Sequence, residues 1–111
     1  MIEKKLIQYL NHNTDIEFYM ERPRTTPDEF VVIERVGGRK ANHIQSASIA
    51  FQSIAKTLMK AAELDEKVRD AVESLTVYPD ISAVKLSSNY NHTDTSMKEY
   101  RYQAVYEITY Y

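Results

Sequence analysis

Two adjacent glycines beside two cations are the residues of this chain whose types could bind a phosphate. Gly37 and Gly38 are the only glycines, and Arg39 and Lys40 follow them directly. A phosphate-binding P-loop spaces its glycines further apart, places Ser or Thr after its lysine and leads into a helix. Here no Ser or Thr follows Lys40, and the next segment resembles a strand. The pattern favours a tight turn between two strands, in which glycine supplies a positive φ.

Other residue types that catalyse reactions or bind metals are scattered along the chain. The histidines lie in separate polar segments without the spacing of metal ligands, and the absence of cysteine excludes thiolate sites and disulfides. No serine stands in a Gly-x-Ser-x-Gly pattern, and the carboxylates between 65 and 73 follow helical spacing, which favours a solvated face. The histidines, serines and carboxylates in question are His12, His43, His92, Ser46, Ser48, Ser53, Asp65, Glu66, Asp70 and Glu73. We therefore expect a protein that is not an enzyme and has no catalytic residue, metal or cofactor.

Tyrosine is the residue type that points to a binding surface, because it supplies 9 residues whereas Phe supplies 3 and Trp none. A tyrosine-rich sheet face can stack on the bases of single-stranded nucleic acid. Such binding usually needs a basic excess, but the net charge is −2 and the cations Lys98 and Arg101 stand among acidic residues. We favour a sheet face packed under a helix. A small nucleic-acid-binding module is the alternative, and it predicts salt-dependent binding that is lost on Tyr102→Ala or Tyr106→Ala.

Hydrophobic periodicity predicts the elements that must position these residues. The expected helices are 2–10 and 53–75, and the expected strands are 16–20, 30–36, 43–52, 84–90 and 100–110. Turns are expected at 11–15 and at the glycine pair, and a longer hairpin loop at 91–99. The order α-β-β-β-α-β-β predicts an α+β fold, with a mostly antiparallel sheet of about five strands and both helices on one face.

Length and composition limit the class of protein. A chain of 111 residues suits a single domain, 1–111, and 43% apolar with 27% charged residues is typical of a soluble globular protein. No apolar run approaches the length of a membrane span, and the N-terminus lacks the apolar core of a signal peptide. We expect a soluble protein without a membrane partner.

Several motifs, in order, resemble one known family. A proline-flanked loop leads into a strand that carries Glu-Arg before a glycine pair. A strand with an aromatic and a glutamine follows, then a helix with paired alanines, and a closing strand that begins with Arg-Tyr. The matching residues are Pro23, Pro27, Phe30, Glu34, Arg35, Gly37, Gly38, Phe51, Gln52, Ala61, Ala62, Arg101 and Tyr102. Together, over residues 20–111, they resemble the tail-terminator (tail-completion) proteins of long-tailed bacteriophages. Val36 departs from the pattern, since a threonine or similar polar residue is usual there.

The resemblance implies a structural function without catalysis. Such proteins form a ring, commonly a hexamer, on the finished end of the tail tube, where the ring stops polymerisation of the major tail tube protein. The ring also offers a surface to the head-tail connector protein, and genome DNA passes through its lumen. The implied location is the virion tail, after assembly in the bacterial cytoplasm. A head-side neck or stopper protein is a neighbouring alternative within the same class.

A ring of identical subunits needs one heterologous interface that closes by rotation. Exposed strand edges and aromatic-rich surfaces are suited to form such an interface between subunits. Our candidates for assembly contacts, with a neighbouring subunit or the lumen, are Arg35, Gly37, Gly38, Arg39, Lys40 and Arg101, and the loop at 89–98 is a further one.

Overall fold

The computed structural model describes residues 1–41, 44–93, 96 and 99–111. Its elements are α1 (Ile2–Asn13), β1 (Phe18–Tyr19), β2 (Phe30–Ala41), β3 (Ile44–Ala55), α2 (Leu58–Glu73), the 3-10 helix η1 (Leu75–Val77), β4 (Ile81–Asn91) and β5 (Tyr100–Tyr110). The expected α+β fold and the order α-β-β-β-α-β-β are confirmed. The five strands form one sheet in the order β1-β2-β3-β5-β4, in which β1 pairs with β2 in parallel and all other pairs are antiparallel.

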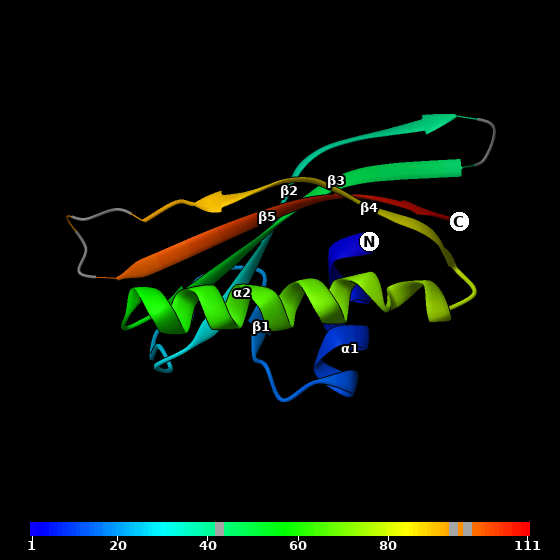
Figure 1. Ribbon diagram of the computed structural model, residues 1–111. Coiled ribbons are helices and arrows are strands. Elements are labelled where there is room, and N and C mark those ends of the chain that lie inside the picture. The colour runs from blue at the N-terminus through cyan, green and yellow to red at the C-terminus, as the bar shows by residue number, and fades with distance from the viewer. Residues whose placement is uncertain (42–43, 94–95, 97–98) are drawn as a thin grey trace.

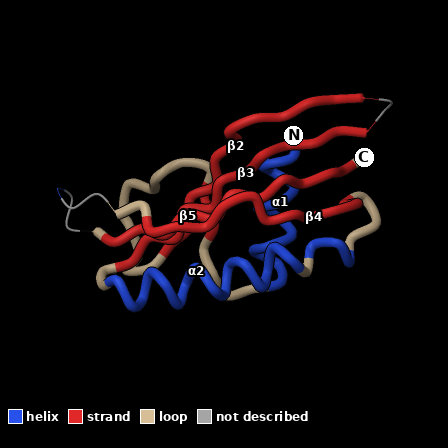
Figure 2. Tube along the Cα trace, turned by 45° about the horizontal axis from the view of Figure 1, so that its top comes forward, coloured by secondary structure: helices blue, strands red, loops and turns tan. Residues whose placement is uncertain are grey.

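Both helices lie on the same face of this sheet, as Figure 1 shows, and the tilted view of Figure 2 shows α2 running along the strands. The core lies between the two layers. Its fully buried members include Leu6 of α1, Val68 of α2, and Ile49, Phe51 and Tyr106 of the sheet. We call this side of the sheet the covered face and the opposite side the open face.

The first helix is longer than its apolar pattern predicts. Ile2, Leu6 and Leu10 are buried along one side, as expected, but the helix continues through the predicted turn at 11–15 and ends at Asn13. Thr14 then ends it, because its backbone is extended (φ −139°, ψ 165°), while its N–H and its hydroxyl both donate to the carbonyl of Leu10. The polar residues 11–13, which suggested a loop, therefore form the C-terminal end of the helix.

The second helix is shorter than predicted. Residues 53–55 belong to β3, where Ile54 and Ala55 pair with β5, and α2 begins after Thr57, whose hydroxyl accepts a hydrogen bond from the Lys60 N–H. Such a side-chain cap fixes where a helix starts. Ile54 continued the apolar spacing of the helix only by coincidence, since it faces away from the helices and opposite Phe30 of β2.

Asp65 was expected on a solvated face, and that prediction is wrong. Its side chain is buried, with 2% of the residue exposed. Arg69 donates from Nε to Asp65 Oδ2 at 3.1 Å, and Asn89 of β4 donates to both carboxylate oxygens at 3.1 and 3.0 Å. Asp65 thus ties α2 to β4 instead of facing water, whereas its neighbour Asp70 is exposed.

The last strand alternates as predicted. Ala104, Tyr106, Ile108 and Tyr110 are buried on the covered face. Tyr106 is fully buried and donates its hydroxyl to Glu73 of α2 at 2.6 Å. Burial and this hydrogen bond raise the pKa of Tyr106, so the hydroxyl stays protonated.

Candidate functional site: the β2–β3 arm, the open face and an acidic groove

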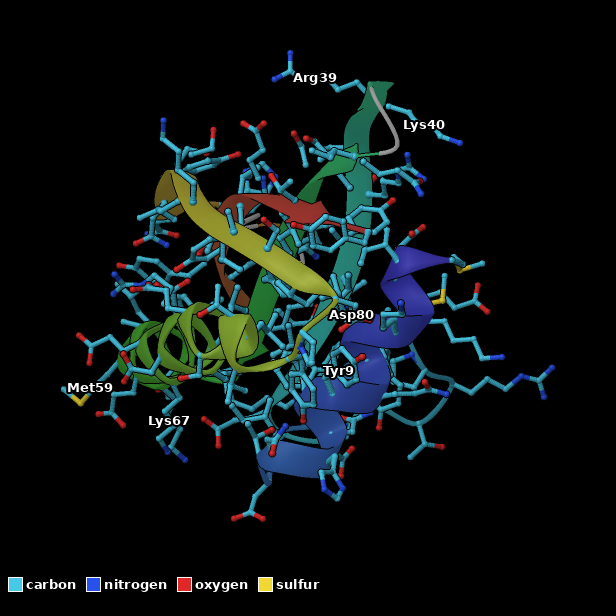
Figure 3. All side chains as sticks on the ribbon, turned by 90° about the vertical axis from the view of Figure 1, so that its right-hand side faces the viewer. Tyr9, Arg39, Lys40, Met59, Lys67 and Asp80 are labelled. Carbon is cyan, nitrogen blue, oxygen red and sulfur yellow. The ribbon has the colours of Figure 1, made fainter. Side chains whose placement is uncertain are left out.

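The glycine pair does not form a turn, contrary to expectation. β2 continues through Gly37 and Gly38 to Ala41, paired with β3, and the connection falls at 42–43, outside the described residues. The register shifts between Arg35 and Gly37, so the pair marks a β-bulge in a strand rather than its end. We call residues 36–41 of β2 and 44–47 of β3 the arm. The arm rises away from the helices in Figure 1, and Arg39 and Lys40 lie at its far end in Figure 3.

Space, not a positive φ, explains the second glycine. A Cβ atom on Gly38 would collide with Nη2 of Arg35 and would lie 3.0 Å from the carbonyl oxygen of Ser46. The Arg35 side chain lies across Gly38, and its Nε reaches the carbonyl oxygen of Gly37 at 3.5 Å. A Cβ on Gly37 would make only an ordinary contact, at 3.8 Å from Cβ of Ser48. Gly38 is therefore the position where a side chain does not fit.

The arm exposes both apolar and cationic side chains. Val36 is 54% exposed and Ile44 is 44% exposed, although both are large apolar residues. The Arg39 side chain is 80% exposed and lies 3.8 Å from Glu107 of β5, a distance that gives a weak ion pair at most. On its outer side, β2 pairs with β1 only at Val31 and Val32, so the described part of β2 beyond Val32 is a free strand edge.

The open face carries a polar ladder across four strands. Gln52 of β3 donates from Nε2 to Gln103 Oε1 of β5 at 3.2 Å and approaches Glu34 Oε2 of β2 at 3.5 Å. Gln103 in turn donates to the hydroxyl of Tyr90 on β4 at 2.7 Å. We call Glu34, Gln52, Gln103 and Tyr90 the polar ladder. It gives this face a row of hydrogen-bonding groups that a polar partner surface could meet.

One of the predicted assembly residues lies apart from the others. Arg35, Gly37, Gly38, Arg39 and Lys40 share one stretch of β2, whereas Arg101 pairs with Ile54 at the opposite end of β3. There the loop before β2 covers the open face. Arg22 stacks over the ring of Phe30 and forms an ion pair with Glu99, while Tyr19 packs edge-on against the same ring. Of the loop at 89–98, residues 94–95 and 97–98, and with them Lys98, lie outside the described residues, as does His43.

A groove with a volume of about 660 Å³ lies between the end of α1 and α2. Ile16, Leu64 and Ala71 give it apolar walls. Its carboxylates are Asp15, Glu17, Glu29 and Asp70, and its one lining cation among the described residues is Lys67. The four ion pairs that the structure describes all lie elsewhere, so none of them neutralises these carboxylates. We call this cavity the acidic groove.

Sequence patterns did not reveal the acidic groove, because its walls come from three separate segments. Asp15 and Glu17 follow α1, Glu29 precedes β2, and Asp70 belongs to α2. The one available signal was that the expected turn at 11–15 and the proline-flanked loop before residue 30 each contained acidic residues. Only the fold shows that these turns meet beside α2.

Among the described residues, no group of three or more His, Cys, Asp or Glu side chains is arranged to hold a metal ion. None of the helices in the described ranges is long and apolar enough to cross a membrane.

No protein-family model matches this chain, and no curated protein matches its sequence. The functional proposal below therefore depends on the ordered motifs of the sequence and on the surfaces just described.

Proposed function

We propose that this protein is a tail terminator of a long-tailed bacteriophage, which forms a ring on the end of the tail tube and stops its growth. The same ring offers a surface to the head-tail connector, and genome DNA passes through it without sequence recognition. The motifs from Pro23 to Tyr102 suggest the class of protein. One structural observation carries the proposal further: two unlike surfaces, the arm and the open face, are left uncovered by the chain's own helices.

Two unlike surfaces are what a ring on a tube requires. A heterologous contact between neighbouring subunits uses different patches on each, and a further face must remain for the tube. The arm suits the first role, since it exposes Val36, Ile44, Arg39 and Lys40 at one edge and end of the sheet. The open face suits the second, because its polar ladder offers hydrogen-bonding groups of the kind that line protein interfaces.

The alternative of nucleic-acid binding through stacked tyrosines finds less support. Tyr106 is fully buried and Tyr110 is 7% exposed, so neither ring can stack on a base. At Tyr106, β5 instead faces α2, and this ring packs edge-on against Phe51 with ring centroids 6.0 Å apart, whereas Tyr100 at the start of the strand is 38% exposed. Substituting Tyr106 should therefore weaken folding before it affects any binding.

Electron microscopy of tail tubes tests the proposal directly. Tubes assembled from the tube protein encoded in the same genome are incubated with the purified chain and then offered fresh tube protein. We expect a discrete ring at one tube end and no further growth from that end. Tubes that elongate at both ends without ring density would refute the proposed function.

A matched pair of substitutions separates a surface effect from a folding effect. Val36→Asp changes an exposed residue of the arm, and Val77→Asp changes a residue of η1 on the helix side that is 78% exposed. Both variants should unfold at the same urea concentration as the parent. We expect Val36→Asp to abolish capping and Val77→Asp to leave it intact.

A further inference from the structure

The arm presents a combination of side chains that needs a complementary partner. Val36 and Ile44 are exposed apolar residues, and Arg39 and Lys40 add two cations at the end. Burying these apolar side chains would be favourable by about 25 cal/mol for each Å² removed from water. A partner must therefore offer apolar contact together with negative charge.

The acidic groove has that combination. Its apolar walls, from Ile16, Leu64 and Ala71, lie among four carboxylates. Tyr19 donates a hydrogen bond to Glu17, but no described cation forms an ion pair with any of the four carboxylates. The groove is open to solvent, and its four exposed carboxylates outnumber Lys67, the one cation among its described lining residues.

The two features lie on opposite sides of the subunit. In Figure 3, Arg39 and Lys40 lie on the side of the sheet at the top of the view, and Lys67, which lines the groove, lies toward the bottom on the helix side. The arm therefore cannot reach the groove of its own chain. We propose that the arm of one copy of this protein inserts into the acidic groove of a second copy, and that this contact, repeated head to tail, closes the ring. The inference rests on the proposed function, whose subunit contact it specifies.

Strand pairing between edges is a less suitable contact for these subunits. β2 and β4 are the long strands with free edges, and every register shift of the sheet falls in one of them. One bulge lies between Arg35 and Gly37, and two lie in β4, between Ile81 and Ala83 and between Leu86 and Ser88. Bulges discourage edge-to-edge pairing because they break the regular row of backbone groups. Insertion of the arm into a groove needs no such row.

Disulfide trapping tests the contact, because the chain has no cysteine of its own. The variant Lys40→Cys/Asp70→Cys carries one thiol on the arm and one in the groove. Under mild oxidation at high concentration, or in the presence of tail tubes, we expect a ladder of linked subunits that ends at the size of the closed ring. Mixing the single variants Lys40→Cys and Asp70→Cys should give linked heterodimers and nothing larger.

A control pair and salt show whether the link reports the proposed contact. In Lys40→Cys/Ser87→Cys the second thiol lies on exposed β4, outside the groove, and we expect no ladder. Salt near 1 M shortens the screening length to about 3 Å and should lower the yield from the groove pair by about tenfold. A ladder from the control pair equal to that from the groove pair would overturn the inference.

Electron microscopy of the same samples separates this inference from the proposed function. Rings on tube ends without a link between arm and groove would overturn the arm-in-groove contact and leave the tail-terminator proposal standing. A linked ring that does not cap tubes would support the contact and refute the proposed function. Circular dichroism of each variant, expected to match that of the parent, confirms that the chains tested are folded.

Discussion

The two faces of the sheet are built from the same strands but differ in burial and in the kind of contacts they make. On the covered face, Ile49, Phe51 and Tyr106 are fully buried beneath the helices. On the open face, the polar ladder links four strands through side-chain hydrogen bonds that remain accessible to water. Because alternate residues of one strand point to opposite faces, a single strand such as β3 contributes to both.

This difference separates the residues that fold the chain from those free to make contacts. Burial of the covered face supplies the hydrophobic stabilisation, which scales with the apolar area removed from water. The hydrogen bonds of the open face contribute less, since water competes for the same groups. Substitutions in the polar ladder and at exposed residues of the arm should therefore leave the subunit folded, whereas Phe30 and Ile54 are buried on the open face and contribute to folding.

The largest effect is expected from truncating a covered-face aromatic residue. Phe51→Ala should lower the free energy of unfolding by about 3–5 kcal/mol, because it leaves a cavity under the helices. Gln52→Ala, one residue along the same strand but in the polar ladder, should lower it by about 1 kcal/mol or less. Urea denaturation measures both. Equal losses would contradict the distinction between the two faces.

Two aspartates of α2 extend the comparison of buried and exposed residues to one helix, because Asp65 is buried and Asp70 is exposed. Asp65→Ala removes the acceptor of Arg69 and Asn89, and we expect a loss of about 1–3 kcal/mol because Asn89 and the partly buried Arg69 lose their partner. Asp70→Ala, on the exposed side of α2, should change stability by no more than about 0.5 kcal/mol. Thermal unfolding of the two variants side by side checks this, and a larger loss for Asp70→Ala would be the contrary result.

The covered face was predictable from the sequence because its signal is periodic. Periodicity predicted a strand at 100–110 with one side packed under a helix, and β5 is buried on that side from Ala104 to Tyr110. The predicted helix boundaries were wrong where a side-chain cap or a strand pairing, and not the apolar periodicity, decides where the helix begins or ends. Thr57 caps α2 after Ile54 and Ala55 have already paired in the sheet, and Thr14 ends α1 after a polar stretch that resembles a turn.

The surfaces were less predictable, since each depends on contacts between distant segments. A glycine pair beside cations suggests a turn, and only the position of Arg35 above Gly38 shows that glycine provides space. The acidic groove and the burial of Asp65 depend on how α1, α2 and β4 pack. No pattern within any one of these segments carries that information.

The glycine pair offers a smaller, local test at the border of the covered face. Gly38→Ala should destabilise the chain by about 1 kcal/mol, because Arg35 must move and the Ser46 carbonyl is crowded. Gly37→Ala should be neutral or slightly stabilising, since its Cβ meets only ordinary contacts. A double-mutant cycle with Arg35→Ala should recover part of the Gly38→Ala loss, and full additivity would show that Arg35 does not occupy that space.

The smallest effect is expected at the clasp that holds α1 to the start of β4. Lys5 Nζ lies 2.7 Å from Asp80 Oδ2, and Tyr9 donates its hydroxyl to the same carboxylate at 2.9 Å. The hydrogen bond from Lys5 holds the pKa of Asp80 below its ordinary value, and its partner Asp80 raises the pKa of Lys5. The Lys5 and Asp80 side chains are 38% and 27% exposed, so solvent screening limits the pair to less than about 1 kcal/mol.

The directions of the two pKa shifts set the pH range in which the clasp of Lys5, Tyr9 and Asp80 stabilises the fold. A lowered Asp80 pKa gives stability that is present above the ordinary aspartate pKa of 3.8 and is lost as pH falls through the lowered value. A raised Lys5 pKa gives stability that is present below 10.5 and is lost as pH rises through the raised value. The urea midpoint of Asp80→Asn should therefore fall below that of the parent at neutral pH and converge with it in strong acid. A difference that persists unchanged in acid would mean that packing, such as the stacking of Tyr9 on Tyr78 at 3.7 Å, holds α1 in place and the charge does not.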